Sequence, residues 1–130
     1  MKRIFTSAVF VLILFCSVLT LSGCWVLLGA AAGAGGYAWV SGVLQSEFEV
    51  SNEKLAAATE KGLKRLALPI KEKSVDHLTA KFKSELADGN DVTIDINAIT
   101  EKSARIKIRV GLLGDQKQSE MIMDSIKKYL

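Results

Sequence analysis

Residues 78–110, LTAKFKSELADGNDVTIDINAITEKSARIKIRV, contain three consecutive runs in which apolar and polar side chains alternate. A period of two is typical of a strand with one buried and one exposed face. The inward positions are Leu78, Ala80, Phe82, Ser84 and Leu86, then Val92, Ile94, Ile96 and Ala98, then Ala104, Ile106, Ile108 and Val110. This stretch therefore predicts three neighbouring strands in an antiparallel meander.

The first connection of the meander predicts how its first two strands are aligned. Residues 87–89 have the sequence Ala-Asp-Gly, with glycine at the position where a three-residue hairpin loop needs a left-handed backbone. Such a loop places Phe82 opposite Ile94 and Lys81 opposite Asp95. The apolar side chains of both strands then lie on the same face, as a buried sheet requires.

The second connection of the meander is predicted to be a five-residue loop over residues 99–103. This length pairs Ile96 with Ile106 and Asp95 with Lys107, so the apolar face continues across the third strand.

Two elements are expected before the meander. Apolar alternation over residues 44–50 predicts a first strand, and Ser51 then has a hydroxyl suited to cap a helix that runs to about Ala67. Pro69 ends this helix, and residues 70–74 are expected to form a short strand.

A terminal helix is expected after the meander. Asp115 is its predicted N-cap, and the helix turns inward the side chains of Ile122, Met123, Ile126 and Leu130. In the preceding helix, Gly62 costs about 1 kcal/mol of helix propensity, which suggests either a close approach to the sheet or an ordinary surface glycine. The element order β-α-β-β-β-β-α over residues 43–130 predicts an α+β fold, a two-layer sandwich with an antiparallel-rich sheet and two helices on one face.

The N-terminal region has a very different composition. The 130-residue chain has 17 basic and 14 acidic side chains, but only Lys2 and Arg3 precede Glu47. These two cations and the apolar run that follows are typical of a secretory signal over residues 1–23. Because the net charge is low and the apolar pattern is regular, we do not expect a disordered chain.

The signal ends in Leu21-Ser22-Gly23-Cys24, which resembles the lipobox of bacterial lipoproteins. The resemblance implies that Cys24 becomes the lipidated N-terminus, anchored to a membrane by its acyl chains. In lipoproteins an aspartate after this cysteine retains the protein at the inner membrane, and here that residue is Trp25. The resemblance thus favours the outer membrane, facing the periplasm. The alternative is an uncleaved signal anchor in which Cys24 is an ordinary thiol.

Residues 24–42 are predicted to be a glycine-rich tether that follows the lipidated cysteine. In one interpretation Gly29, Gly33 and Gly36 allow close helix packing in lipid, with Trp25, Tyr37 and Trp39 at the membrane interface, and the protein is a membrane-active oligomer. In the other, the stretch is a flexible spacer at the membrane surface. We favour the spacer because five glycines make a poor spanning helix.

The chain as a whole resembles a family of small bacterial lipoproteins that carry a domain of unknown function. The resemblance rests on the lipobox, the glycine-rich leader, the capped helix, the meander, and Arg109-Val110-Gly111 followed by Gly114-Asp115 before the last helix. It implies a location and a fold, and it brings no established activity.

Few residues of the mature chain are suited to catalysis or metal binding. His77 is the only histidine, and lipidation of Cys24 leaves no free thiol after cleavage. One histidine without cysteine does not make a zinc site, and the spacing of the carboxylates does not require two of them to converge in a cleft. We therefore expect no enzymatic activity, no cofactor and no metal.

The exposed side of the predicted meander carries a basic stripe, with Asp95 as its one acidic residue. Its cations are Lys81, Lys83, Arg105, Lys107 and Arg109. We expect them to meet an anionic envelope component or a protein partner, or else to form a solvated face that discourages aggregation. Nucleic acid is not an expected partner, because the stripe has no stacking aromatic side chains. The sequence thus predicts a membrane-anchored, non-enzymatic envelope module.

Overall fold

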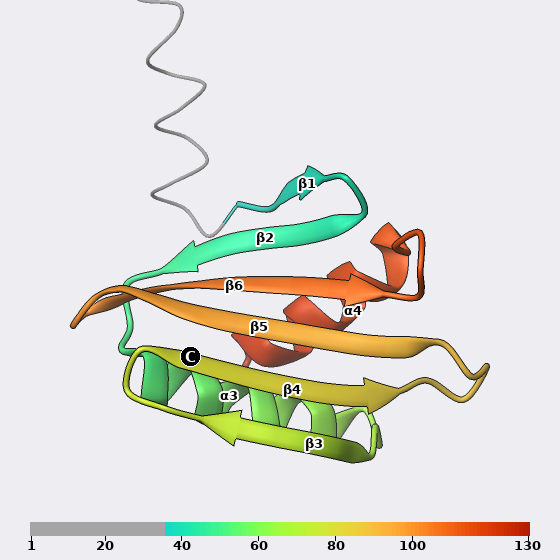
Figure 1. Ribbon diagram of the computed structural model, residues 1–130, viewed down its shortest axis with the longest axis horizontal. Helices are drawn as coiled ribbons and strands as arrows, with labels where there is room; N and C mark the ends of the chain where they lie inside the picture. The colour runs from blue at the N-terminus through green and yellow to red at the C-terminus, as the bar shows by residue number, and fades with distance from the viewer. Residues whose placement is uncertain (1–35) are drawn as a thin grey trace, which may run out of the picture. The chain divides into compact units, whose positions relative to one another are not determined.

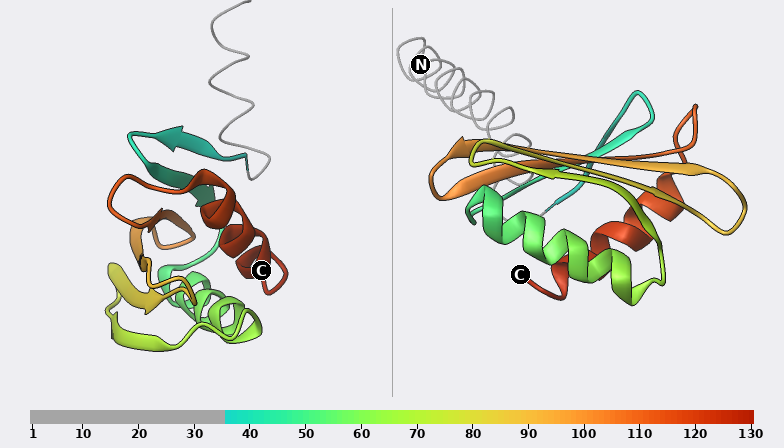
Figure 2. Two further views of the ribbon diagram at one scale, coloured as in Figure 1. Left: turned by 90° about the vertical axis from the view of Figure 1, so that its right-hand side faces the viewer. Right: turned by 60° about the horizontal axis from the view of Figure 1, so that its bottom comes forward.

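The computed structural model describes residues 36–130, in which six strands form one sheet and two helices lie together on one of its faces (Figures 1 and 2). The elements are β1 Ala38–Val40, β2 Val43–Phe48, α3 Asn52–Arg65, β3 Ile70–Val75, β4 Thr79–Glu85, β5 Asp91–Thr100, β6 Ser103–Val110 and α4 Gln116–Lys127. All neighbouring strands are antiparallel, in the order β1-β2-β6-β5-β4-β3. This confirms the predicted α+β class.

The predicted alignment of the meander is confirmed. Phe82 pairs with Ile94 and Lys81 with Asp95 across β4 and β5. The loop between these strands is closed by the Leu86 amide, which donates to the Asn90 carbonyl at 2.9 Å. Gly89 has φ +87°, the left-handed conformation that the loop requires.

The second connection is tighter than expected, although the register it was expected to produce is correct. Ile96 pairs with Ile106, but β5 continues to Thr100, which pairs with Ser103. The register shifts between Ala98 and Thr100, so one extra residue is accommodated as a β-bulge rather than in a five-residue loop.

Both predicted helix caps are present. The Lys54 amide donates to Ser51 Oγ at 3.3 Å, and the Gln118 amide donates to Asp115 Oδ1 at 3.0 Å. The first helix ends at Arg65, slightly before the expected position, because Ala67 adopts φ +55° ahead of the proline. Local hydrogen bonding thus positions both helices as expected.

Gly62 marks a close approach, but the expected partner was wrong. It faces α4 rather than the sheet, because a Cβ built on it would lie 2.8 Å from Ile126 Cγ1. The Ser125 hydroxyl also donates to the Gly62 carbonyl at 3.0 Å. The glycine therefore allows the two helices to contact each other over the sheet.

The folded region begins before residue 43, where the domain was expected to start. Trp39 in β1 pairs with Leu44 in β2, and its partly buried side chain packs against the core. Ser41 and Gly42 connect the strands with φ 50° and 80°, the two positive values of a type I′ hairpin. Residues 38–42 are therefore part of the sheet rather than of a spacer.

The hydrophobic core lies between the sheet and the helices. It is built from side chains of β2, α3, the meander strands and α4, among them Leu44, Leu55, Leu63, Phe82, Ile94, Ile96, Ile106, Ile108, Ile122, Met123 and Ile126, each with 0% exposure. The described residues form a compact unit with this core of their own. We therefore expect residues 36–130 to fold independently.

Candidate functional site

The sheet face opposite the helices is called the outer face here (Figure 2). The alternating burial of β4 and β6 places all five cations of the predicted basic stripe on this face. In β4 and β6 these side chains alternate with buried ones, as the period-two pattern predicts. β6 lies in the interior of the sheet, between β2 and β5, so its cations have neighbours on both sides.

The charge balance of the outer face differs from the expected five cations against one carboxylate. The Arg105 guanidinium forms an ion pair with Glu47 of β2, with Nε 2.8 Å from Oε1. Lys83 Nζ lies 2.7 Å from Glu72 Oε2 of β3, and Lys81 Nζ lies 3.5 Å from Asp95 Oδ1. Three of the five cations are therefore neutralised by carboxylates.

These pairs also shift proton affinities. The hydrogen bond from Lys83, together with its charge, lowers the pKa of the Glu72 carboxyl. The same hydrogen bond and the charge of Glu72 raise the pKa of Lys83. Each partner thus favours the charged form of the other.

The two remaining cations of the stripe, Lys107 and Arg109, have no carboxylate within ion-pair distance among residues 36–130. Lys107 lies between Gln45 and Asp95 in the register of the sheet, but the Asp95 carboxylate is paired with Lys81. Arg109 Nη2 donates to the Ser41 carbonyl at 3.3 Å, a contact that leaves its charge uncompensated. The positive charge of the stripe that no carboxylate neutralises among residues 36–130 therefore lies on residues 107–109 of β6.

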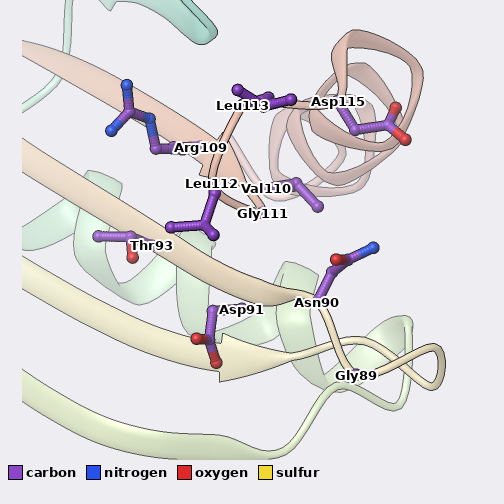
Figure 3. A pocket seen from close by; sticks show the side chains of 11 residues that line it. Gly89, Asn90, Asp91, Thr93, Arg109, Val110, Gly111, Leu112, Leu113 and Asp115 are labelled. Atoms are coloured by element: carbon purple, nitrogen blue, oxygen red, sulfur yellow. The ribbon is translucent and has the colours of Figure 1, made fainter.

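A hollow of about 670 Å³ lies at the Arg109 end of the outer face, between the β4–β5 loop and the loop joining β6 to α4 (Figure 3). Its lining residues are Gly89, Asn90, Asp91, Thr93, Arg109, Val110, Gly111, Leu112, Leu113, Gly114 and Asp115. The stripe therefore leads directly into this hollow.

Residues 111–114, called the tip loop here, carry two leucines that were not among the predicted site residues. Leu112 is 95% exposed and Leu113 is 92% exposed. An apolar side chain in a loop has no periodic pattern that predicts its burial, so sequence alone gave no sign of this exposure. The tip loop thus adds an apolar element to a polar face.

The tip loop is held firmly at both ends. The Gly111 amide donates to the Asp91 carbonyl at 2.8 Å, and Gly111 has φ +71°. Gly114, with φ +83°, packs against the Gly42 backbone so closely that a Cβ would lie 2.1 Å from the Gly42 carbonyl oxygen. The two leucines are therefore displayed on a constrained backbone.

The single histidine lies at the other end of the sheet. His77 is 94% exposed at its side chain, and its Nδ1 lies 2.7 Å from Glu53 Oε1. Within residues 36–130, no group of three or more histidine, cysteine or acidic side chains is arranged to hold a metal ion. In the same range, neither helix combines the length and the apolar character needed to cross a bilayer.

The expected lipidation site, Cys24, lies outside the described residues, as do Gly29 and Gly33 of the expected tether. Gly36 is described, and its carbonyl accepts a hydrogen bond from Ser46 Oγ at 3.1 Å. The predictions for Cys24 and for the glycine segment before residue 36 therefore stay predictions.

Within residues 36–130, fold and site together define a small two-layer α+β domain in which no helix covers one charged face of the sheet. The chain belongs to the family described as "Protein of unknown function (DUF3568)", whose model matches residues 7–129. No curated protein matches the chain. Membership confirms the expected domain of unknown function, and the family description names no activity.

Proposed function

We propose that this protein is a lipid-anchored, non-enzymatic binding module of the bacterial envelope. The lipid anchor is supported by the Leu21-Ser22-Gly23-Cys24 motif, which follows a basic and apolar leader. The acyl chains on Cys24 would hold the folded residues 36–130 at a membrane, which we propose to be the outer membrane on its periplasmic side.

The binding role is supported by the outer face. Within residues 36–130, it is a surface of six strands that no helix covers, and Lys107 and Arg109 have no carboxylate partner on it. Such a surface attracts an anionic envelope component through its charge rather than through a catalytic group. The charge pairs described above limit this attraction to the β6 end of the stripe.

A non-enzymatic role is supported by how the reactive side chains are used. His77 pairs with Glu53 in an exposed position, and Asp115 caps α4. Glu47, Glu72 and Asp95 are paired with cations of the outer face. In the described part of the chain, these groups therefore each have a structural partner.

Mass spectrometry of the mature N-terminal peptide tests the anchoring. The native chain should begin at Cys24 and carry acyl chains, and it should stay with the membrane fraction after a high-salt wash. Cys24→Ala should abolish both the acyl mass and the processing at this site. Native protein that carries no lipid and washes off the membrane would refute the proposal.

A separate measurement tests the binding surface. Reversing the charges of Lys81, Lys107 and Arg109 together should abolish retention of the protein on an anionic matrix at low salt. Unchanged retention of the triple variant would exclude the outer face as the contact surface.

A further inference from the structure

We infer that Lys107, Arg109 and the tip loop form a docking site for the surface of an anionic phospholipid bilayer. This inference deepens the proposed function and rests on it, because it names the anionic envelope component that the outer face contacts.

The ion pairs divide the five outer-face cations into two groups. Lys81, Lys83 and Arg105 each have a carboxylate partner on a neighbouring strand. Lys107 and Arg109 have none among residues 36–130, and they lie two residues apart on one side of β6, about 6.6 Å by the rise of a strand. This spacing suits two negatively charged headgroups, or two oxygens of one.

The tip loop adds an exposed apolar surface, which the binding of a water-soluble anion would not require. Leu112 and Leu113 are almost fully exposed and follow Arg109 by three and four residues. Figure 3 shows both leucines projecting from the loop, and both line the hollow together with Arg109. Cations next to uncovered apolar side chains match the surface of a bilayer, where charged headgroups lie above acyl chains.

The fold does not require leucine at either position. The backbone conformation of the tip loop depends on Gly111 and Gly114, and Asp115 caps the helix that follows. Two polar residues would satisfy the same backbone at residues 112 and 113. Since two leucines in water leave apolar surface unburied, their display on a constrained loop points to a partner that covers them.

Two carboxylates near the site weaken its attraction for anions, so binding also depends on the apolar contact of the leucines. Asp91 and Asp115 also line the hollow, although Figure 3 shows their side chains directed away from Arg109. They weaken the attraction that the two cations exert at long range. The site therefore needs both the cations and the apolar contact, and the loss of either should be measurable.

Vesicle co-sedimentation of residues 36–130 tests the inference, since these residues have their own core. The probe is vesicles of phosphatidylethanolamine containing phosphatidylglycerol, with phosphatidylcholine vesicles as the neutral comparison. We expect binding to the anionic vesicles that is stronger than to the neutral ones. Lys107→Gln with Arg109→Gln should lower the partition coefficient about tenfold or more. Leu112→Ser with Leu113→Ser should lower it about tenfold or more as well.

A matched control separates this site from the overall charge. Lys83→Gln with Arg105→Gln removes the same number of cations from the same face, but at positions that are already paired with Glu72 and Glu47. This control should bind within about threefold of the unchanged domain. Equal losses in the two lysine-containing double variants, or no loss in the leucine variant, would overturn the inference.

The outcome is distinguishable from failure of the proposed function, because residues 36–130 do not include Cys24. A lipidated native chain whose isolated domain ignores anionic vesicles would overturn only the docking site. An unlipidated native chain whose domain binds these vesicles through Lys107, Arg109 and the leucines would overturn only the anchoring. Circular dichroism of each variant verifies that the exposed substitutions leave the fold intact.

Discussion

Gly62 of α3 packs directly against Ile126 of α4, with no room for a side chain between the two helices. A Cβ on Gly62 would lie 2.8 Å from Ile126 Cγ1 and 2.9 Å from its Cα. Because one of these atoms belongs to the backbone, rotation of the isoleucine side chain alone does not relieve the contact. The two helices therefore cover the sheet at a distance that this glycine sets.

Gly62→Ala should destabilise the domain for this reason. The substitution gains up to about 1 kcal/mol of helix propensity, but overpacking costs about 1–3 kcal/mol and the helices must move apart. Urea unfolding followed by circular dichroism should show a net loss of stability. Lys61→Ala, at the exposed neighbouring position, is the control and should change stability little. A more stable Gly62→Ala protein would contradict the packing described here.

Gly114→Ala should destabilise the protein more than Gly89→Ala. Both glycines have positive φ, so each substitution costs about 1–2 kcal/mol in backbone conformation. A Cβ on Gly89 would meet no heavy atom within 4 Å, whereas one on Gly114 would collide with the Gly42 carbonyl oxygen. Thermal unfolding of both variants measures the difference. Equal melting temperatures would show that the tip loop does not need its contact with the β1–β2 turn.

Local signals were enough to predict much of the fold. The glycine of the 87–89 loop and the apolar alternation of its two strands defined the register between them. Ser51 and Asp115 predicted where the two helices begin, because an N-cap side chain accepts a hydrogen bond from an amide only a few residues away. These features depend on short stretches of chain, so a single sequence contains the information that specifies them.

Features that depend on distant pairing were not predictable in the same way. β2 lies beside β6, and this neighbourhood brings Glu47 to Arg105 across 58 positions of sequence. Without the strand order, the stripe was overestimated as a block of positive charge. The Ser41-Gly42 turn was a usable signal for β1, but it lies at the end of an uncharged, glycine-rich stretch that masked it.

Residues 36–130 should form a more stable domain than residues 43–130. The shorter chain loses β1, with the Trp39 packing against the core. It also loses the hydrogen bond from the Tyr37 hydroxyl to Asp124 of α4 and the contact of Lys127 Nζ with the Tyr37 ring, 4.1 Å from its centroid. We expect a loss of about 2 kcal/mol or more in urea unfolding.

A substitution in the longer chain separates packing from chain length. Trp39→Ala should reproduce much of that loss, whereas Val40→Thr, at an exposed position of the same strand, should be close to neutral. Truncation also uncovers the edge of β2, which should promote association in size-exclusion chromatography. Identical stability of the two chains would show that β1 adds nothing to the fold.

Glu60 should make the domain depend on pH in the acidic range. Its carboxylate joins α3 to β3, with Oε1 2.8 Å from Lys64 Nζ and Oε2 2.5 Å from Lys73 Nζ. The hydrogen bonds from Lys64 and Lys73 lower the pKa of Glu60 from 4.5 to about 2. Since the folded state binds this proton less tightly than the unfolded state, the ion pairs stabilise the fold fully above pH 4.5.

This contribution should disappear as the pH falls from 4.5 to about 2, and Glu60→Gln removes it. The melting temperatures of the native protein and the variant should therefore differ at neutral pH and converge towards pH 2. Added salt should shrink the neutral-pH difference, because the lysines are solvent-exposed. Glu101→Gln, in the exposed β5–β6 turn, is the control for a charge lost elsewhere. A difference between native protein and Glu60→Gln that stays constant with pH would show that the carboxylate acts through packing rather than through its charge.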